Sequence, residues 1–329
     1  MRRCAAAFGL LALAAWPAHA IELTVGAVQI SEFGGVGLDQ QVDKLLWRGG
    51  IAMVSQNDLF GGLSGLAFTG PDQRVTMVSD RGNFVSGQLA YDQDHRLFGF
   101  IGVRIEPIQN SKGEPLPRQY SRDAEAIAAV MRDGVPVAVR VGFEHLTRVA
   151  EFALTDGVPG GAAKEIEIPK WLTDTRTNES LEAVCIAPDA SPIAGSTLLL
   201  TEGVIDDDGQ HVAWLLGRAD KGPLSYQSSP DVNPTDCAFL PNGDLLVLER
   251  GISFLSFTMT LRLVPAAEVR PSNLMKGEVL LSATGGDIDN MEQVAVHTAP
   301  GGETRIVIGS DNNFNDWERS LLLEFALAD

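Results

Sequence analysis

The sequence predicts an all-β fold, a β-propeller made of four-stranded blades. Similar hairpin-like segments recur at an even spacing, and strand-like runs fill the intervals between them. Four strands per repeating unit is the pattern of a propeller blade. A β-sandwich is the alternative, but it does not require evenly spaced and similarly worded hairpins.

Each predicted hairpin has a short apolar strand, a turn with Gly, Pro or Asp, and a second strand rich in Val, Leu or Ile. The five anchor residues of these hairpins are 60, 57, 54 and 56 residues apart: Gly65, Glu125, Glu182, Asp236 and Glu292. Residues 122–133, "RDAEAIAAVMRD", would suit a helix if taken alone. Their similarity to the other hairpins predicts a strand instead.

The spacing leaves room for two further strands in each unit, and runs at 145–154, 164–169 and 211–217 supply candidates. Five units are visible, and a degenerate sixth blade from the N-terminal region is the alternative. The fifth unit ends with its third strand, at 319–329. We therefore expect N- and C-terminal strands to pair and close the ring, with 21–30 as the free strand. Residues 44–55 are a further strand pair or a bent strand.

Residues 1–20 have the three parts of a secretory signal peptide. Arg2 and Arg3 are followed by an apolar run to Trp16 and by a small-residue site ending at Ala20. Cleavage after Ala20 would leave 21–329 as a single domain that is periplasmic or secreted. A buried N-terminal helix is the alternative. No later run is long enough to span a membrane as an apolar helix.

The net negative charge of the chain limits the kinds of partner that it is expected to bind. The net charge is −18, and loss of Arg2 and Arg3 makes it −20. Nucleic acids and anionic membranes prefer basic surfaces, so neither is expected, whereas hard cations are compatible with this one. We expect a monomer. Export permits a Cys185–Cys237 disulfide, although two unpaired buried cysteines on neighbouring strands are the first expectation.

The hairpins predict a ring of acids at one face of the propeller. An antiparallel hairpin places its first residue beside its last, and all blades point the same way. Crowded carboxylates attract hard cations, and calcium is the expected ion. The predicted calcium ligands are Asp80, Glu125, Glu182, Glu202, Asp236, Glu292 and Asp311. Alternatively, these acids cap the backbone of the next blade or pair with Arg81, Arg122 or Arg250.

Few nucleophiles or bases accompany the predicted ring. His145 is the candidate acid or base, with Glu182 as a second catalytic candidate. Ser64 opens a hairpin and is expected to be a turn serine rather than a nucleophile. No role is predicted for His95, His211 or His297, and blade packing is predicted for Trp47, Trp171, Trp214 and Trp317.

Several motifs together resemble the phytase-like family, described as having esterase-like activity of phytase. They are "FGGLSGLAF", "SDRG", "RDAEAIA", "NESLEAV", "PTDCAFLPNGDLLVLERG", "DNMEQVAV" and "SDNNFNDWERSLLLEFAL". The resemblance covers about residue 60 to the end. It implies an exported β-propeller that hydrolyses phosphate or other esters, with calcium as the ion.

Phytate itself fits this chain poorly. Only six lysines are present, and the basic residues near the predicted ring are His145, Arg81, Arg122 and Arg250. These residues suit the binding of one phosphate group better than the six phosphate groups of phytate. The three arginines are the expected anion-binding groups. The hypothesis is therefore a calcium-assisted hydrolase of smaller phosphoesters or other esters. The alternatives are a non-catalytic binding propeller with structural calcium and a propeller lactonase.

Overall fold

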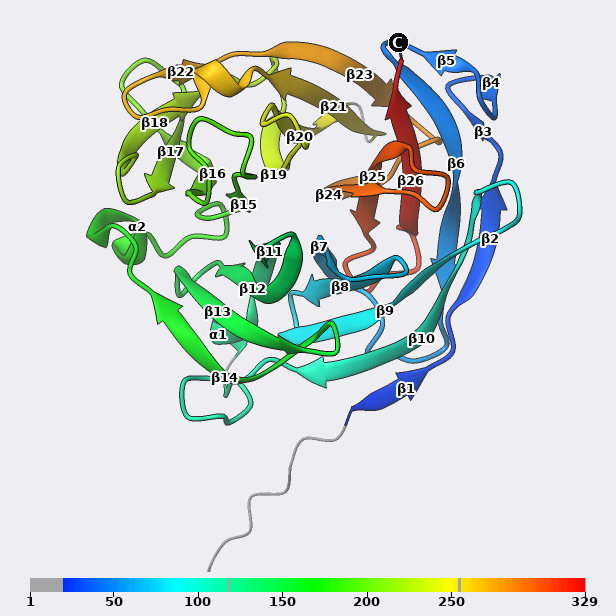
Figure 1. Cartoon of the computed structure of the whole chain (residues 1–329), viewed down its shortest axis with the longest axis horizontal. Coiled ribbons are helices and arrows are strands. Elements are labelled where there is room, and N and C mark those ends of the chain that lie inside the picture. Colours follow the sequence, from blue (N-terminus) through cyan, green and yellow to red (C-terminus); the bar gives the residue numbers. More distant parts are fainter. Residues whose placement is uncertain (1–19, 118, 254–255, 329) are drawn as a thin grey trace, which may run out of the picture.

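The strands form five blades around a central axis (Figure 1). The computed structural model describes residues 20–117, 119–253 and 256–328. The predicted signal peptide, apart from Ala20, lies outside the described residues. The predicted all-β propeller is confirmed, with five blades rather than six. Residues 124–132 form a strand, as their similarity to the other hairpins predicts.

Each blade starts with its inner strand, and the sheets are mainly antiparallel. Blade 1 contains β7 (Leu63–Gly70), β8 (Arg74–Ser79), β9 (Asn83–Tyr91), β10 (Leu97–Pro107) and β1 (Ile21–Leu23). Blade 2 contains β11 (Ala124–Arg132), β12 (Val135–Phe143), β13 (Arg148–Thr155) and β14 (Val158–Ile166). Blade 3 contains β15 (Ala183–Ile186), β16 (Thr197–Ile205), β17 (His211–Leu216), β18 (Gly222–Tyr226) and β22 (Leu274–Met275), and β22 is parallel to β18.

Blade 4 contains β19 (Asn233–Phe239), β20 (Leu245–Ser253), β21 (Ser256–Val264) and β23 (Glu278–Thr284). Blade 5 contains β24 (Asn290–Thr298), β25 (Thr304–Asp311), β26 (Ser320–Leu327), β6 (Leu45–Val54) and β2 (Gly26–Ile30). The small elements are β3 (Glu32–Phe33), β4 (Val36–Gly37), β5 (Gln41–Val42), α1 (Gln119–Arg122), α2 (Lys170–Asp174) and η1 (Ala266–Glu268).

Blade 5 closes the ring by combining both ends of the chain, as predicted. The strand that pairs directly with the C-terminal β26 is β6. The predicted free strand, 21–30, divides instead. Its second half, β2, pairs with the outer edge of β6, and its first half, β1, pairs with β10 of blade 1. The N-terminal region therefore joins blades 5 and 1 rather than forming a sixth blade.

Five apolar clusters hold the blades together, one at each contact between neighbours. The alternating side chains of a strand face the two neighbouring sheets, so each blade contributes to two clusters. Trp47 of β6 is fully buried between blades 4 and 5. Trp171 and Trp214 pack between blades 2 and 3, with ring centroids 6.4 Å apart. The prediction for Trp317 is wrong, because its side chain is 92% exposed.

A disulfide joins blades 3 and 4. Cys185 of β15 and Cys237 of β19 are bonded, with 6.0 Å between their Cα atoms. The first expectation, two unpaired cysteines, is therefore corrected. The inner strands of consecutive blades lie side by side around the axis, which brings the two Cα atoms into the range of a disulfide.

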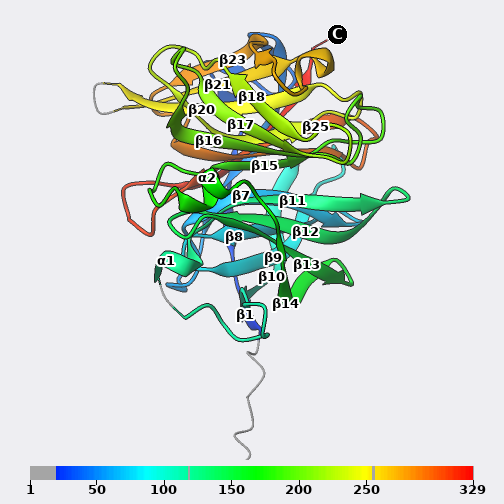
Figure 2. The same cartoon turned by 90° about the vertical axis from the view of Figure 1, so that its left-hand side faces the viewer.

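None of the helices among the described residues is long and apolar enough to cross a membrane. Seen edge-on in Figure 2, α1 and α2 lie on the same face of the molecule. Helix α1 leads directly into Asp123 and the inner strand of blade 2. This face is therefore where the starts of the inner strands lie.

Candidate metal centre at the channel mouth

Three positions recur in every inner hairpin at this face. In blade 5, Asn290 pairs with Asp311, and in blade 4, Asn233 pairs with Arg250. In both hairpins the pairing shifts by one residue just after the next pair, so these two pairs are equivalent. In blades 1 to 5 the first position holds Gly62, Asp123, Ser180, Asn233 and Asn290. The second holds Ser64, Glu125, Glu182, Thr235 and Glu292. The third holds Asp80, Glu144, Glu202, Arg250 and Asp311. We call these fifteen residues the mouth.

A β-bulge marks the second position in four blades. The pairing shifts by one residue between Ala124 and Ala126 in blade 2, and between Met291 and Gln293 in blade 5. The extra residue, Glu125 or Glu292, has no partner opposite it in the second strand. Bulges often redirect a side chain next to a functional site. Here the bulge places an acidic residue within a strand whose neighbouring residues are buried in the core.

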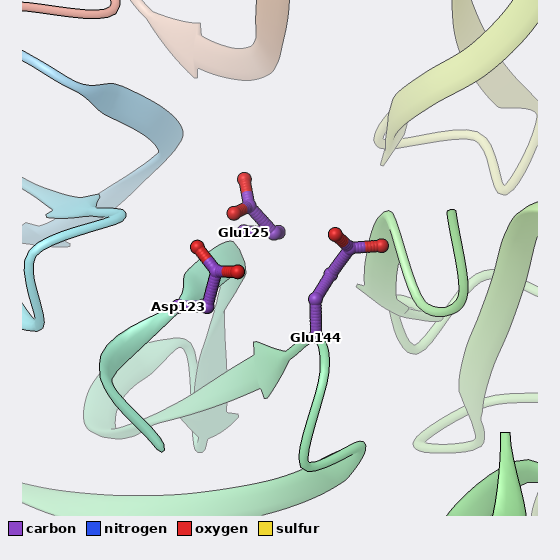
Figure 3. Close-up of side chains that lie close together, drawn as sticks. All are labelled: Asp123, Glu125 and Glu144. Atoms are coloured by element: carbon purple, nitrogen blue, oxygen red, sulfur yellow. The ribbon is translucent and has the colours of Figure 1, made fainter. Parts of the chain in front are cut away.

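Blade 2 carries an acid at all three positions, and these acids converge. Ligand oxygens of Asp123, Glu125 and Glu144 all lie within 4.8 Å of one another. Figure 3 shows the three carboxylates extending into one shared space. Glu144 also accepts a 2.7 Å hydrogen bond from the backbone N–H of Ser180. His145 Nε2 lies 3.1 Å from Asp123 Oδ2, which restricts the orientation of Asp123.

Burial and mutual repulsion raise the pKa values of the mouth carboxyls. Burial, together with the charges of Asp123, Glu292 and Glu144, raises the pKa of Glu125 well above its usual value. Burial raises the pKa of Glu144 to about 7. The pKa of Glu182 is also raised well above its usual value by burial and by Glu144, with which it shares a hydrogen bond. Bound protons or cations must therefore balance the negative charge of these carboxylates.

The acids of blades 1 and 5 continue the mouth. Burial and the charges of Asp311 and Asp123 raise the pKa of Asp80 to about 7. Burial raises the pKa of Asp311 to about 6. The Oδ1 atom of Asp80 is buried and has no hydrogen-bond partner among the described residues. A buried carboxylate oxygen without a donor is a position that a cation would satisfy.

Arg250 is the basic member of the mouth. Its guanidinium lies 2.9 Å from Glu292 and 3.6 Å from Glu202, and it also donates to the side chain of Asn290. Burial and the opposing effect of Arg250 leave the pKa of Glu292 at about 8. Glu202 also accepts a 3.3 Å hydrogen bond from Asn233. The carboxylates nearest blade 4 thus form ion pairs with an arginine, whereas among the described residues no arginine or lysine forms an ion pair with Asp123, Glu125 or Glu144.

Asp236 lies outside the mouth. The register places Thr235, rather than Asp236, at the position of Glu125 and Glu292. Since successive side chains in a strand face opposite sides, an offset of one residue turns the side chain away. The Asp236 carboxylate accepts 2.8 Å hydrogen bonds from the backbone N–H groups of Cys237 and Val294. Asp236 therefore joins blade 4 to blade 5. This is the alternative stated for these acids in the sequence analysis, in which each caps the backbone of the next blade.

The other candidate residues lie near the mouth or in its wall. Arg81 stacks on the Phe314 ring and donates to the carbonyl of Asp58. Arg122 packs on Gly82, next to Arg81, and donates to the carbonyl of Leu116. Both arginines are largely exposed. Ser64 is buried, and its hydroxyl lies 3.5 Å from the carbonyl oxygen of Gly62.

The predicted ligand set did not include Asp123 or Glu144. Glu144 closes the hairpin that Glu125 anchors, so the antiparallel pairing of hairpin ends would have added it to the set. Asp123 stands two residues before Glu125, and this spacing places both side chains at the start of one inner strand. The hairpin end was therefore a usable signal for Glu144, and the two-residue spacing was one for Asp123.

Comparisons with known proteins relate the chain to one family. The family model described as "Phytase-like: Esterase-like activity of phytase" matches residues 58–314. No curated protein matches. Among solved structures, "Structure of U3-55K" aligns with a TM-score of 0.36 and 12% identity, over 86% of this chain and 77% of that chain. "Crystal structure of RRP9 WD40 repeats" aligns with a TM-score of 0.38 and 12% identity, over 87% of this chain and 77% of that chain.

Proposed function

The chain belongs to the phytase-like family, and from this membership we propose that it hydrolyses phosphoesters or other esters with the help of a calcium ion at the mouth. The family description names an esterase-like activity, and a hydrolase-type propeller fits both the family and the fold. The proposed ligands are Asp123, Glu125 and Glu144, with Asp80 as a further oxygen donor.

The observation that supports this proposal most directly is the convergence of three carboxylates, with no arginine or lysine ion-paired to them among the described residues. Calcium takes six to eight oxygen ligands and accepts carboxylates in flexible arrangements. The donor set of blade 2 consists of carboxylate oxygens alone, and Asp80 adds a buried oxygen that lacks a donor. Asp236 and Glu202 are not in this set, because backbone N–H groups, Arg250 and Asn233 occupy their carboxylates.

Bound calcium would polarise an ester and favour attack by water. The protein's own residues supply the remaining functions in this proposal. Glu182, buried and hydrogen-bonded to Glu144, is the proposed proton acceptor, since it lies beside a proposed ligand without belonging to the ligand set. His145 holds Asp123 in its ligand orientation. The exposed Arg81 and Arg122 are the groups that bind an anionic substrate at the rim.

The substrate class follows from the cationic side chains available. Arg81 and Arg122 are exposed arginines at this rim and are proposed to bind one phosphate group, whereas Arg250 is committed to Glu292 and Glu202. A small phosphomonoester or neutral ester is therefore proposed in preference to phytate. The proposed location is the periplasm or the exterior of the cell, in keeping with the Cys185–Cys237 disulfide.

The test is hydrolysis of p-nitrophenyl phosphate and p-nitrophenyl acetate by purified protein, with added calcium and with chelator. Calcium-dependent turnover of either substrate supports the proposal. Turnover of lactones without phosphatase activity would favour the lactonase alternative. If calcium raises the melting temperature but supports no turnover, the protein is the non-catalytic propeller with structural calcium.

A further inference from the structure

A polar groove lies beside the mouth, between the ends of blades 3 and 4. Its volume is about 380 Å³, and it is open to solvent. The strand end at Ile205, the start of β17 at His211 and the loop 227–233 form its walls. This groove contains a histidine and a serine that the proposed metal site does not use.

The two side chains are hydrogen-bonded to each other, and the donor of this hydrogen bond can be assigned. His211 Nδ1 lies 2.6 Å from the backbone carbonyl oxygen of Glu202. A carbonyl oxygen only accepts hydrogen bonds, so Nδ1 carries the proton and Nε2 has the free lone pair. Nε2 lies 3.1 Å from Ser228 Oγ. The serine hydroxyl is therefore the donor, and the imidazole is positioned as its base.

The surroundings suit a reactive pair. His211 is 5% exposed, and burial lowers its pKa, so the ring is neutral at neutral pH. Ser228 is only half-buried and lines the groove together with the exposed Gln227. The side-chain amide of Gln227 is a hydrogen-bond donor of the kind that stabilises an oxyanion.

We propose that Ser228 and His211 form a second, metal-independent hydrolytic site that cleaves small carboxylic esters. A nucleophile within hydrogen-bond reach of a base, itself oriented by a third group, is the arrangement that activates serine. Here the orienting group is the Glu202 carbonyl rather than a carboxylate. The groove is large enough for a short acyl group and a small alcohol.

The reaction balances without a cofactor. Ser228 Oγ bonds to the ester carbonyl carbon while His211 Nε2 takes the hydroxyl proton. The alkoxide leaves with that proton as the free alcohol, and the acyl group remains on Ser228. Water then attacks the acyl-serine, giving up a proton to His211. The carboxylic acid departs, and the proton returns to Ser228.

This site is chemically separate from the proposed calcium site. Its reacting atoms belong to β17 and the loop after β18, and its base contacts only a backbone oxygen of the mouth. It therefore differs in its requirement for metal: excess chelator abolishes hydrolysis at the mouth but not at Ser228. Glu125→Gln should likewise leave the Ser228 activity intact.

The experiment treats the full chain, in excess chelator, with p-nitrophenyl acetate and with a fluorophosphonate probe. The expected result is chelator-resistant turnover and a covalent adduct that mass spectrometry locates on Ser228. Ser228→Ala should remove the adduct, and Ser228→Ala and His211→Gln should each lower turnover by at least about 100-fold. Ser228 is in a loop, so its variant should keep the wild-type melting temperature even if His211→Gln does not.

Ser229→Ala is the matched control. Ser229 is the next residue, but its hydroxyl accepts a hydrogen bond from Arg262 rather than facing His211. It should keep both the adduct and the turnover. The proposal is overturned if the wild-type protein gains no adduct at Ser228, or if Ser228→Ala hydrolyses the ester at the wild-type rate. Either result would leave the calcium-dependent activity untouched.

Discussion

Blades 2 and 4 share the same backbone at the mouth and carry opposite chemistry there. In blade 2 the three positions are Asp123, Glu125 and Glu144. In blade 4 they are Asn233, Thr235 and Arg250. The register around the bulge is the same in both hairpins, so the difference lies in the side chains alone.

This difference shows how a nearly symmetric ring acquires one site. Arg250 lies within 3.6 Å of carboxylates from blades 3 and 5. It therefore neutralises the acids on its own side of the channel. Within the described residues no arginine or lysine forms an ion pair with the acids of blade 2, and the charge of Arg250 reaches Glu125 only at longer range. A divalent cation would complete the charge balance where the protein does not.

The largest expected effect follows from removing the arginine of blade 4. Arg250→Met leaves Glu292 and Glu202 buried without their cation, and the free energy of unfolding at pH 8 should fall by about 3 kcal/mol. Urea unfolding of the metal-free protein measures this change. Arg270→Met, at an exposed arginine, should change stability by less than about 0.5 kcal/mol. Equal effects from the two variants would show that Arg250 has no special electrostatic role.

The next effect concerns the acid of blade 2 and its counterpart in blade 4. Glu125→Gln should lower calcium-dependent turnover about 100-fold, equivalent to about 2.7 kcal/mol, because a ligand carboxylate is lost. Titration calorimetry should show weaker calcium binding by the same variant. Thr235→Val changes the equivalent position and should keep both calcium binding and turnover.

Stability separates loss of function from unfolding in this pair. Glu125→Gln removes a buried carboxylate with a raised pKa, so the metal-free variant should be more stable than wild type at pH 8. Thr235→Val loses hydroxyl contacts to the Leu248 and Met291 carbonyls and should cost about 1 kcal/mol. A Glu125→Gln protein that is both inactive and unfolded would contradict the proposed role.

The sequence predicted the symmetric part of this arrangement better than the asymmetric part. Evenly spaced hairpins indicated the blades, and hairpin geometry indicated that their ends meet at one face. The assignment of Asp236 depended on register, and the one-residue bulge at Thr235 leaves no signal in the sequence "PTDCAFLP". Closure was predicted, but the choice of β6 over 21–30 as the partner of β26 depended on pairing between distant segments.

The third expected effect is a dependence of stability on pH and calcium. The pKa values of Asp80 and Glu144 are about 7 and that of Glu292 is about 8, all above the ordinary range near 4. The folded protein therefore holds more protons than the unfolded chain between about pH 4 and 8. Stability is retained below this window and falls as pH rises through it.

Thermal unfolding at pH 5 and pH 8 measures this dependence. With chelator present, the melting temperature should be lower at pH 8. Calcium at 100 times its Kd should raise the melting temperature at pH 8 by about 5 °C, since ligand binding at that excess contributes about 2.7 kcal/mol. Glu144→Gln should reduce the calcium effect, whereas Arg270→Met should not. A melting temperature that rises with pH in chelator would contradict the proposed compensation of charge.

The smallest expected effect concerns substrate charge at the rim of blade 2. Arg122 precedes Asp123, is exposed and packs against Gly82, the residue that follows Arg81. Arg122→Ala should raise the KM for p-nitrophenyl phosphate about 5-fold, close to 1 kcal/mol, because one exposed charge-assisted contact is lost. Calcium-dependent turnover of the neutral acetate ester should not change. If both KM values rise together, the arginine supports the fold of the rim rather than binding the phosphate, and the substrate preference must come from the acids of blade 2.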